Sequence, residues 1–526
     1  MKRGLSILLC GSLMAGMLCL PSMAAQPDLA AQKPALQGDF WVMVNGEYVT
    51  FPDAAPKSLN NRSFLPFAAV FEQLGFAQKD MHWDQATQTV TATKPDVDYT
   101  NVHGEAAVGD MTVELTLGST TMKLWYEGDT IGDPHGNQAQ VVQDVKMDVA
   151  PFANTAIGRT YIPLGLVAEA LGYRVGWDQT NQTVIVDDVK SILAGNQETY
   201  ELMDQLMDYS RTFAGKNYKV TGDYAMDMKM NGTSQSAGFQ KMDMVFDLDG
   251  TYTMFTQGNT AFQYDTDLKM DFTVNMDGSD VTNAMLTQAG VTENPFPMDV
   301  TMEMRGDLAD GNMYFRSKAL AGLLGQADLE NAWIKLDMKE LMDQSSATLG
   351  MNYAQLLELS TAAQEMSFEE YLALTLQDTP ATSIYSNAAY LLDQMNLMFA
   401  DSKFVKSGNS YVNTVDLDGA KMVYTLYTNG SKVNGYAMEM SADMDQLGAM
   451  SLSATMKGTQ MDMNMAFNVA MDQGAGESFA MDLSMTMDGN YQTTSVKPTT
   501  QPAAGDTVVD LMDLLGAAAE VPQIVA

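Results

Sequence analysis

Cysteine is almost absent from this chain of 526 residues, and its scarcity excludes several kinds of chemistry. Cys10 and Cys19 both lie within residues 1–25, where Lys2 and Arg3 precede a short apolar run that ends in small residues. That order is typical of a secretory signal peptide. The rest of the chain has no cysteine, which excludes disulfides, thiolate metal sites and thiol nucleophiles after cleavage.

Basic residues and long apolar runs are also scarce. Residues 26–526 hold 27 lysines and arginines against 66 aspartates and glutamates, a net charge of −39. Nucleic acid and anionic headgroups would repel such a polyanion, so we expect no nucleic-acid partner. No run after the signal peptide approaches the roughly 20 apolar residues that cross a bilayer. We therefore expect a secreted, extracytoplasmic protein associated with the cell envelope, with no transmembrane segment and with envelope components or surface proteins as partners.

Motifs for common enzyme chemistry are missing. The three histidines, His82, His103 and His135, form no metal-binding spacing, and the chain has neither a Gly-x-Ser-x-Gly elbow nor a phosphate-binding loop. Asp247-x-Asp249-Gly250 lacks the remaining ligands of a calcium loop and favours a turn. The sequence predicts no enzyme, no cofactor, and no catalytic, cofactor-binding or metal-ligating residue.

A motif written twice dominates the first 190 residues. The two copies share these residues: Arg62, Pro66, Gly75 and Trp83 in the first, and Arg159, Pro163, Gly172 and Trp177 in the second. Apolar residues at helical spacing follow each proline, so we expect a short helix that begins at the proline and ends at the glycine. Each copy is then strands, helix and hairpin, and stacking two copies completes one core. The arginines are expected to be structural, paired with a carboxylate or with carbonyls.

These motifs resemble the copper amine oxidase N-terminal (stalk-like) domain over about residues 39–188, although the first copy has Asn61 where the second has Gly158. The resemblance implies an accessory module of sheet on short helices, usually found on the cell surface or in the envelope. It does not imply oxidase activity, because the three histidines show no copper-binding spacing and no Asn-Tyr is followed by Asp or Glu, the context in which the family forms its quinone.

The sequence predicts an α+β protein, mainly antiparallel β, in which the duplicated strand-helix-hairpin module precedes a large curved antiparallel sheet with a helical insert. The predicted order is a signal peptide at 1–25, a flexible lead at 26–38, the stalk domain at 39–188, a Met-rich β domain at 189–493 with its insert at about 318–400, and a linker with a short C-terminal helix at 494–526. Asp249-Gly250, Asn429-Gly430 and Asp488-Gly489 predict turns between strands.

Methionines recur at every second position of the predicted strands. Because side chains alternate between the two faces of a strand, they share one apolar face opposite an acidic one. The residues that we assign to this candidate ligand face are Met226, Met228, Met230, Met298, Met302, Met304, Met438, Met440, Met461, Met463, Met465, Met481 and Met485.

Three interpretations of this face remain open. Methionine can fill a core that the 318–400 helices close; its adaptable side chain suits an apolar ligand; and its thioether binds Cu(I). Residues 190–490, with strands at Tyr314–Arg316 and Trp333–Asp337, resemble the LolA/LppX-type lipoprotein-carrier fold in layout, which implies a lipid-like ligand. The leading hypothesis is a non-enzymatic envelope protein with an interaction module and a binding or scaffold domain. A carrier of an apolar ligand is the alternative, and a thioether copper binder is the second alternative.

Overall fold

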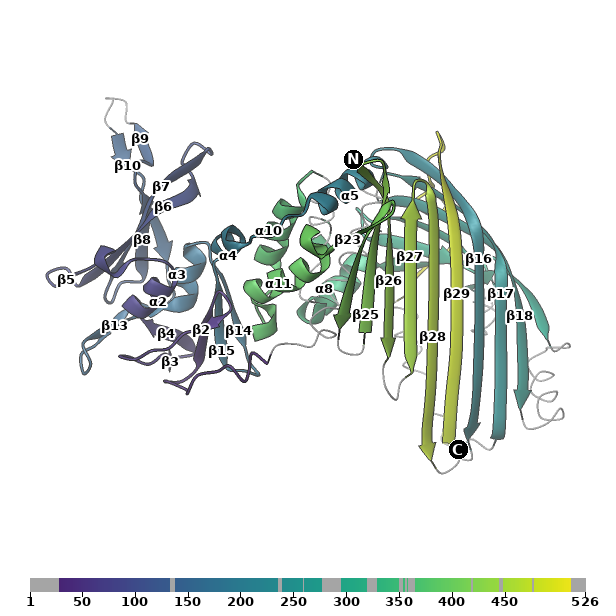
Figure 1. Cartoon of the computed structure of the whole chain (residues 1–526), viewed down its shortest axis with the longest axis horizontal. Helices are drawn as coiled ribbons and strands as arrows, with labels where there is room; N and C mark the ends of the chain where they lie inside the picture. The colour runs from purple at the N-terminus through teal and green to yellow at the C-terminus, as the bar shows by residue number, and fades with distance from the viewer. Residues whose placement is uncertain are drawn as a thin grey trace. The chain divides into compact units, whose positions relative to one another are not determined.

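The computed structural model describes residues 28–132, 138–234, 239–258, 260–276, 295–318, 329–349, 353–354, 357, 365–417, 420–443, 448–474 and 477–511. The predicted signal peptide lies outside them. The chain forms two compact units (Figure 1). The repeat unit contains Gln26–Gln197 and Ala373–Asp393, and the sheet unit contains Glu198–Leu372 and Gln394–Ala526. In the described ranges no helix is both long and apolar enough to span a bilayer.

The repeat unit is built mainly from short strands and two equivalent helices. Its elements are β1 (Trp41–Val44), β2 (Glu47–Tyr48), β3 (Lys57–Leu59), β4 (Arg62–Pro66), α2 (Phe67–Gln73), the 3-10 turn η1 (Gln78–Asp80), β5 (Met81–Asp84), β6 (Thr89–Thr100), β7 (Ala106–Thr116), β8 (Thr121–Tyr126), β9 (Thr130–Gly132), β10 (Gln138–Gln140), β11 (Gln143–Lys146), β12 (Phe152–Asn154), β13 (Arg159–Pro163), α3 (Leu164–Ala170), β14 (Arg174–Asp178), β15 (Thr183–Asp187) and α4 (Val189–Gly195). The predicted strand-helix-hairpin order is confirmed in both copies.

The two copies exchange strands rather than stacking as separate units. The opening strands β1 and β2 of the first copy pair with the closing hairpin β15 and β14 of the second, in the order β14-β15-β1-β2. Strand β1 runs parallel to β15, with Trp41 opposite Thr183. The hairpin β5-β6 of the first copy pairs with β7, in the order β11-β8-β7-β6-β5, and β13 pairs with β4. Neither copy therefore has a complete sheet of its own.

The helices end as the motif predicts. Gly75 and Gly172 have φ of 85° and 82°, in the left-handed region where glycine has no steric penalty. The amide of Phe76 donates to the carbonyl of Phe71, which is the bond of a Schellman cap. The difference between Asn61 and Gly158 is also explained, because both residues (φ 58° and 63°) occupy left-handed turn positions and asparagine tolerates that conformation.

Apolar side chains of both copies form one core. Its fully buried members include Leu65, Phe71, Val113, Ile162 and Val167, contributed by strands and helices of both copies. A side chain of this size contributes roughly 1.5–3 kcal/mol when it is buried. A core shared in this way explains why the motif occurs as a pair.

Residues 373–393 pack in the repeat unit although they follow most of the sheet unit in sequence. The guanidinium of Arg174 donates to the carbonyls of Leu376 (3.0 Å), Thr379 (2.6 Å) and Ser386 (2.6 Å). It also pairs with Asp187 at 2.6 Å, and the two side chains are only 6% and 0% exposed. We call residues 373–393 the docked segment.

Two further carboxylate bonds hold the docked segment. Asp187 accepts a bond from the amide of Ala388 at 3.0 Å, and Asp178 accepts one from the amide of Ile384 at 2.9 Å. Both aspartates lie at the ends of the closing hairpin of the second repeat, so this hairpin supplies most of the polar contacts.

The sheet unit consists of long strands and a small set of helices. Its elements are α5 (Glu201–Arg211), β16 (Asn217–Ser234), β17 (Phe239–Gln257), β18 (Ala261–Met276), β19 (Phe296–Val300), β20 (Glu303–Asp307), β21 (Asn312–Arg316), β22 (Trp333–Asp337), α8 (Met338–Leu349), η4 (Asp401–Lys403), β23 (Val405–Ser407), β24 (Ser410–Leu417), β25 (Ala420–Asn429), β26 (Lys432–Asp443), β27 (Ala449–Lys457), β28 (Gln460–Gly474), β29 (Glu477–Thr493) and β30 (Val508–Asp510). Three elements of the predicted insert begin or end in the docked segment: α10 (Phe368–Asp378), η3 (Ile384–Ser386) and α11 (Ala388–Phe399). A capping box begins α10, because Ser367 and Glu370 exchange side-chain to amide bonds.

The long strands form one curved sheet of 15 strands among the described residues, in the order β23-β24-β25-β26-β27-β28-β29-β16-β17-β18-β20-β21-β22-β30, with β19 also paired to β18 (Figure 1). Its pairs are antiparallel except β22 with β30. The predicted α+β class with a large antiparallel sheet is confirmed.

Two of the predicted turns are wrong. Asn429-Gly430 does end β25, but Asp249-Gly250 lies inside β17 and Asp488-Gly489 inside β29. The glycines are needed there for space: a Cβ on Gly250 would stand 2.2 Å from the carbonyl oxygen of Asp267, on the neighbouring strand. Glycine in a strand often marks such a close approach rather than a turn.

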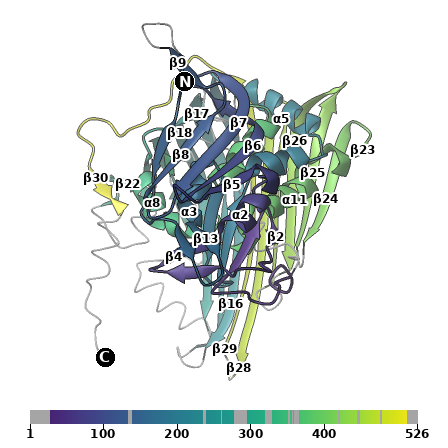
Figure 2. The same ribbon diagram turned by 90° about the vertical axis from the view of Figure 1, so that its left-hand side faces the viewer.

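Part of the segment predicted as a linker with a short C-terminal helix is a strand. Residues 508–510 form β30, which pairs in parallel with β22 and lies beside it in Figure 2. The predicted continuation beyond residue 511 falls outside the described residues.

Candidate ligand-binding face

The two faces of the sheet differ in burial at every second residue. On β16, Met226, Met228 and Met230 are half-buried, whereas the intervening Asp227 and Lys229 are exposed. Strands β28 and β29 show the same alternation along their length. We call the face that bears the methionines the Met face and the opposite one the polar face.

The strand register lines up apolar side chains in a row across the sheet. Residues directly opposite each other in an antiparallel pair share a face. The central row of the Met face is Val415, Met422, Met440, Leu452, Met465, Met485, Met226, Leu248, Met270 and Met298. It is apolar at every position from β24 to β19.

The neighbouring row is apolar as well. It runs through Ala420, Ala442, Met450, Phe467, Leu483, Met228, Phe246, Phe272 and Phe296. The rings of Phe246 and Phe272 stack with centroids 4.3 Å apart. Two adjacent rows therefore make a continuous apolar surface.

One end of the Met face is closed by helix α5, which lies at the ends of the long strands in Figure 1. Met203 and Leu206 of α5 are 2% and 3% exposed. Phe213, just after α5, packs on Tyr218 and Tyr491 of the sheet with centroids 5.7 and 6.1 Å away. Burial raises the pKa of Tyr491 above its ordinary value. This end is a sealed core.

The middle of the Met face is only partly sealed. In the central row Met422 and Met270 are buried, at 2% and 8% exposure, but the members between them are half-buried: Met440, Leu452, Met465, Met485, Met226 and Leu248. The Met face thus changes from a closed core to a surface with accessible thioethers.

The structure places the predicted methionines as follows. Five lie in the central row and one in the neighbouring row: Met226, Met298, Met440, Met465 and Met485, and then Met228. Met230 lies opposite Met481, and Met463 lies in a row that also holds Met438. Met461 lies beside Tyr491, Met304 lies opposite Tyr264, and Met302 comes just before β20. Met438 and Met461 are buried, at 7% and 8% exposure. The rest are half-buried. The assignment of these residues to a ligand remains a prediction.

Sequence reasoning missed the leucine members of the central row. Leu248 and Leu452 keep the same alternate spacing as the methionines, so that spacing was the available signal. These residues form rows because particular strands lie side by side in the sheet. The alternation within one strand does not show which strands those are.

The polar face carries a shallow groove of about 830 Å³. Lys421 and Asp227 lie at its two sides, and small side chains form its floor: Ser441, Ser451, Ala466 and Ser484. Asp227, Asp247 and Asp271 lie directly opposite one another on adjacent strands. A hydrogen bond with Asp227 raises the pKa of Asp247, because crowded carboxylates resist ionising together.

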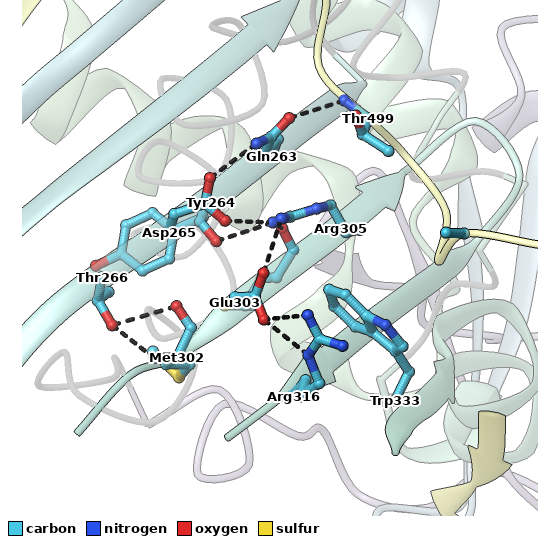
Figure 3. A network of polar contacts seen from close by, with 12 residues as sticks. Gln263, Tyr264, Asp265, Thr266, Met302, Glu303, Arg305, Arg316, Trp333 and Thr499 are labelled. Atoms are coloured by element: carbon cyan, nitrogen blue, oxygen red, sulfur yellow. Dashed lines mark hydrogen bonds and ion pairs between the residues drawn. The ribbon is translucent and has the colours of Figure 1, made fainter. Parts of the chain in front are cut away.

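A charged cluster that the sequence did not predict lies on the polar face near β20 (Figure 3). Arg305 pairs with Asp265 at 2.6 Å and with Glu303 at 3.2 Å, and Arg316 pairs with Glu303 at 2.5 Å. The guanidinium carbons of Arg305 and Arg316 lie 5.3 and 4.5 Å from the ring centroid of Trp333. The cluster is electrically neutral, which favours a structural role. The feature of the sequence that could have indicated this cluster is the pair Arg305 and Arg316, which lie close together in a chain with few basic residues.

The C-terminal segment covers this cluster. The amide of Thr499 donates to Gln263, and the indole nitrogen of Trp333 donates to Asp506 at 3.0 Å. Strand β30 then pairs with β22. Residues 494–510, which belong to the segment predicted as a linker with a short C-terminal helix, thus cross the sheet edge and end in a strand.

The part of the chain that the structure describes contains no group of three or more histidine, cysteine, aspartate or glutamate side chains placed to hold a metal. The predicted repeat arginines form one ion pair each. Arg62 pairs with Asp148, and Arg159 pairs with Asp53 at 3.2 Å. Each arginine also donates to the carbonyl of the residue before it.

The fold and site define a two-part protein: a duplicated β module with a shared core, and a large antiparallel sheet with one apolar face. The family model described as copper amine oxidase N-terminal domain matches residues 43–186 and, in a second match, residues 137–205. The resemblance drawn from the repeated motif is confirmed for this part of the chain.

No curated protein matches the chain. Among solved structures, one titled for lipid–protein interactions in lipovitellin is similar with a TM-score of 0.20 and 7% identity. The similarity covers 56% of this chain, which spans only 27% of the lipovitellin chain. At that TM-score the likeness carries no argument about function.

Proposed function

We propose that this protein is an exported, non-enzymatic binding protein whose Met face accommodates an apolar, lipid-like ligand. The observation that carries the proposal is the central row, which is apolar across the sheet yet half-buried in its middle. A structural core would be sealed along its whole length, as it is beneath α5.

The dimensions of the row suit an extended apolar chain. Adjacent strands lie about 4.8 Å apart, so a row from β24 to β19 spans on the order of 40 Å. Each methylene that moves from water onto such a surface contributes about 0.8 kcal/mol. Long acyl chains therefore gain most from binding there.

Methionine suits this task better than the branched residues that strands usually prefer. Its unbranched, polarizable side chain repacks around partners of different shape. A rigid valine or isoleucine face would favour one shape, whereas a thioether face adapts to several. The choice of Met465, Met485 and Met226 at the centre of the row is consistent with this role.

Export and envelope association belong to the same proposal. The signal-peptide pattern at residues 1–25 and the acidic charge support them. We propose that the repeat unit serves as the interaction module toward envelope components or other surface proteins, while the sheet unit binds the ligand.

The test uses the mature protein purified without detergent. Organic extraction followed by mass spectrometry should recover lipid, and the delipidated protein should enhance the fluorescence of cis-parinaric acid on binding it. Replacing Met465 and Met485 together by glutamine should weaken parinaric acid binding at least tenfold, because two polar amides enter the apolar row.

A matched control changes the other face of the same strands. Asn464→Gln combined with Thr486→Gln alters exposed neighbours on β28 and β29 and should leave parinaric acid affinity unchanged. An extract without lipid, together with no fluorescence enhancement, would contradict the proposal. Equal losses in both double variants would show that the binding is not on the Met face.

A further inference from the structure

The repeat unit contains two cavities that are equivalent by the internal duplication. One has a volume of about 710 Å³ and includes Trp83, Gln85 and Glu72 of the first copy. The other has about 750 Å³ and includes the corresponding Trp177, Gln179 and Glu169 of the second copy. Cavities of this size are typical of small-molecule sites. We call them the first and second repeat cavities.

Each cavity is completed by an arginine from the other copy. Arg159 lines the first repeat cavity and Arg62 lines the second. Each guanidinium is paired with an aspartate of the same cavity, Arg159 with Asp53 and Arg62 with Asp148. The exchange of strands between the copies therefore builds the same set of polar groups twice.

A tryptophan with a fixed ring lies at each cavity. Trp83 is 43% exposed and Trp177 is 40% exposed, although large apolar side chains are normally buried. The indole nitrogen of Trp83 donates to Gln85 at 3.1 Å, and that of Trp177 donates to Gln179 at 2.9 Å. The bond fixes the ring edge and leaves an oriented aromatic surface exposed. Packing alone does not explain retaining an exposed tryptophan in both copies.

Backbone strain supports a role for a second glutamine in each cavity. Gln88 and Gln182 line the first and second repeat cavities and have φ of 53° and 48°. A residue with a long side chain is uncommon in this left-handed region, where glycine and asparagine are favoured. Residues with such strained backbone angles cluster at binding sites, where contact of the side chain with a ligand outweighs the cost of the strain. The same strained glutamine occurs in both copies.

We propose that the two repeat cavities bind saccharide, one sugar chain segment in each. A pyranose ring has an apolar C–H face that packs on an aromatic ring and a rim of hydroxyls that donate and accept hydrogen bonds. Each cavity offers that combination: an oriented indole, two glutamine amides, a carboxylate and an arginine–aspartate pair.

The charge of the cavities disfavours other ligands. The first repeat cavity has one arginine against two carboxylates, and the second has one arginine against three. Phosphorylated or otherwise anionic ligands would be repelled. The polar rims do not suit a lipid. A neutral, hydroxyl-rich ligand is the class that remains, and two equivalent sites would bind a polysaccharide with avidity.

The experiment titrates the mature full-length protein with cellotetraose, maltotetraose and tetra-N-acetylchitotetraose, following tryptophan fluorescence and calorimetric heat. At least one probe should bind with a stoichiometry of two per chain. Trp83→Ala and Trp177→Ala should each reduce the stoichiometry to one, and the double variant should lose binding at least tenfold in affinity.

The matched control is Ile131→Ala, which removes another exposed apolar side chain (52% exposed) outside both cavities and should bind as the original chain does. Circular dichroism establishes that each variant is folded, and Trp83→Phe combined with Trp177→Phe should restore part of the affinity because the aromatic surface returns. The proposal is overturned if no probe binds at millimolar concentration, or if the double alanine variant binds as before. Either result leaves lipid binding by the Met face untouched.

Discussion

Replacing Arg174 by methionine should release the docked segment from the repeat unit. The guanidinium is buried against Asp187 and donates to three carbonyls of residues 373–393. Methionine keeps much of the side-chain volume and removes every one of these bonds. The buried carboxylate of Asp187 is then left without its cation.

Breaking a buried ion pair by removing one partner costs about 3–5 kcal/mol, mostly because the other charge stays buried. That cost corresponds to an opening equilibrium larger by roughly two to four orders of magnitude, at about 1.4 kcal/mol for each factor of ten. The assay is native-state hydrogen exchange of the Ile384 and Ala388 amides, which donate to Asp178 and Asp187. Both should lose protection by that factor, while central amides of β28 keep theirs.

The pH dependence gives an independent check. Burial raises the pKa of Asp187, and Arg174 opposes that rise. In Arg174→Met the pKa rises further, so the carboxyl is tolerated better when it is neutral. Protection in the variant should therefore recover as the pH falls through the raised pKa and be lost again as the pH increases. Adding Asp187→Asn should restore protection at neutral pH. Unchanged exchange in Arg174→Met, or no rescue by Asp187→Asn, would refute the reasoning.

Three further predictions follow from packing and charge. Gly176→Ala should expose the docked segment to limited proteolysis, because its Cβ would meet the carbonyl oxygen of Ala381 at 1.9 Å, whereas Gly165→Ala, with nothing within 4 Å, should not. Leu206→Ala should lower the free energy of unfolding of the sheet unit by about 2–5 kcal/mol in a urea titration, since this α5 side chain is 3% exposed. Asp247→Asn should raise the melting temperature at pH 7, because it removes the repulsion between Asp247 and Asp227. This gain over the original chain should shrink as acidification protonates Asp247 through its raised pKa. A gain that grows on acidification would contradict the repulsion between the two carboxylates.

Local patterns predicted local structure well. The turn at Asn429-Gly430, the helix boundaries at Gly75 and Gly172, and the alternation of the methionines in strands follow from periodicity and from residues with special backbone preferences. These signals depend on neighbours within a few positions, so they can be read from the chain alone.

Long-range pairing could not be predicted in the same way. Strand β1 pairs with β15, which follows it by more than a hundred residues. Arg174 donates to the carbonyl of Leu376, which is about two hundred residues further along the chain. Asp-Gly pairs inside β17 and β29 were predicted as turns because the dipeptide alone does not show that another residue approaches it closely, as Asp267 approaches Gly250 and Tyr252 approaches Gly489. The alternate methionines were visible, but only the register of the sheet assembles them into rows.

Methionine oxidation footprinting tests the central claim most directly, because it reads the accessibility of individual thioethers. Peroxide should oxidise Met226, Met465 and Met485 in the delipidated protein while sparing the buried Met422 and Met461. Saturation with parinaric acid should protect the first three. If these residues oxidise equally with and without the fatty acid while it is bound, the Met face is not where an apolar ligand binds.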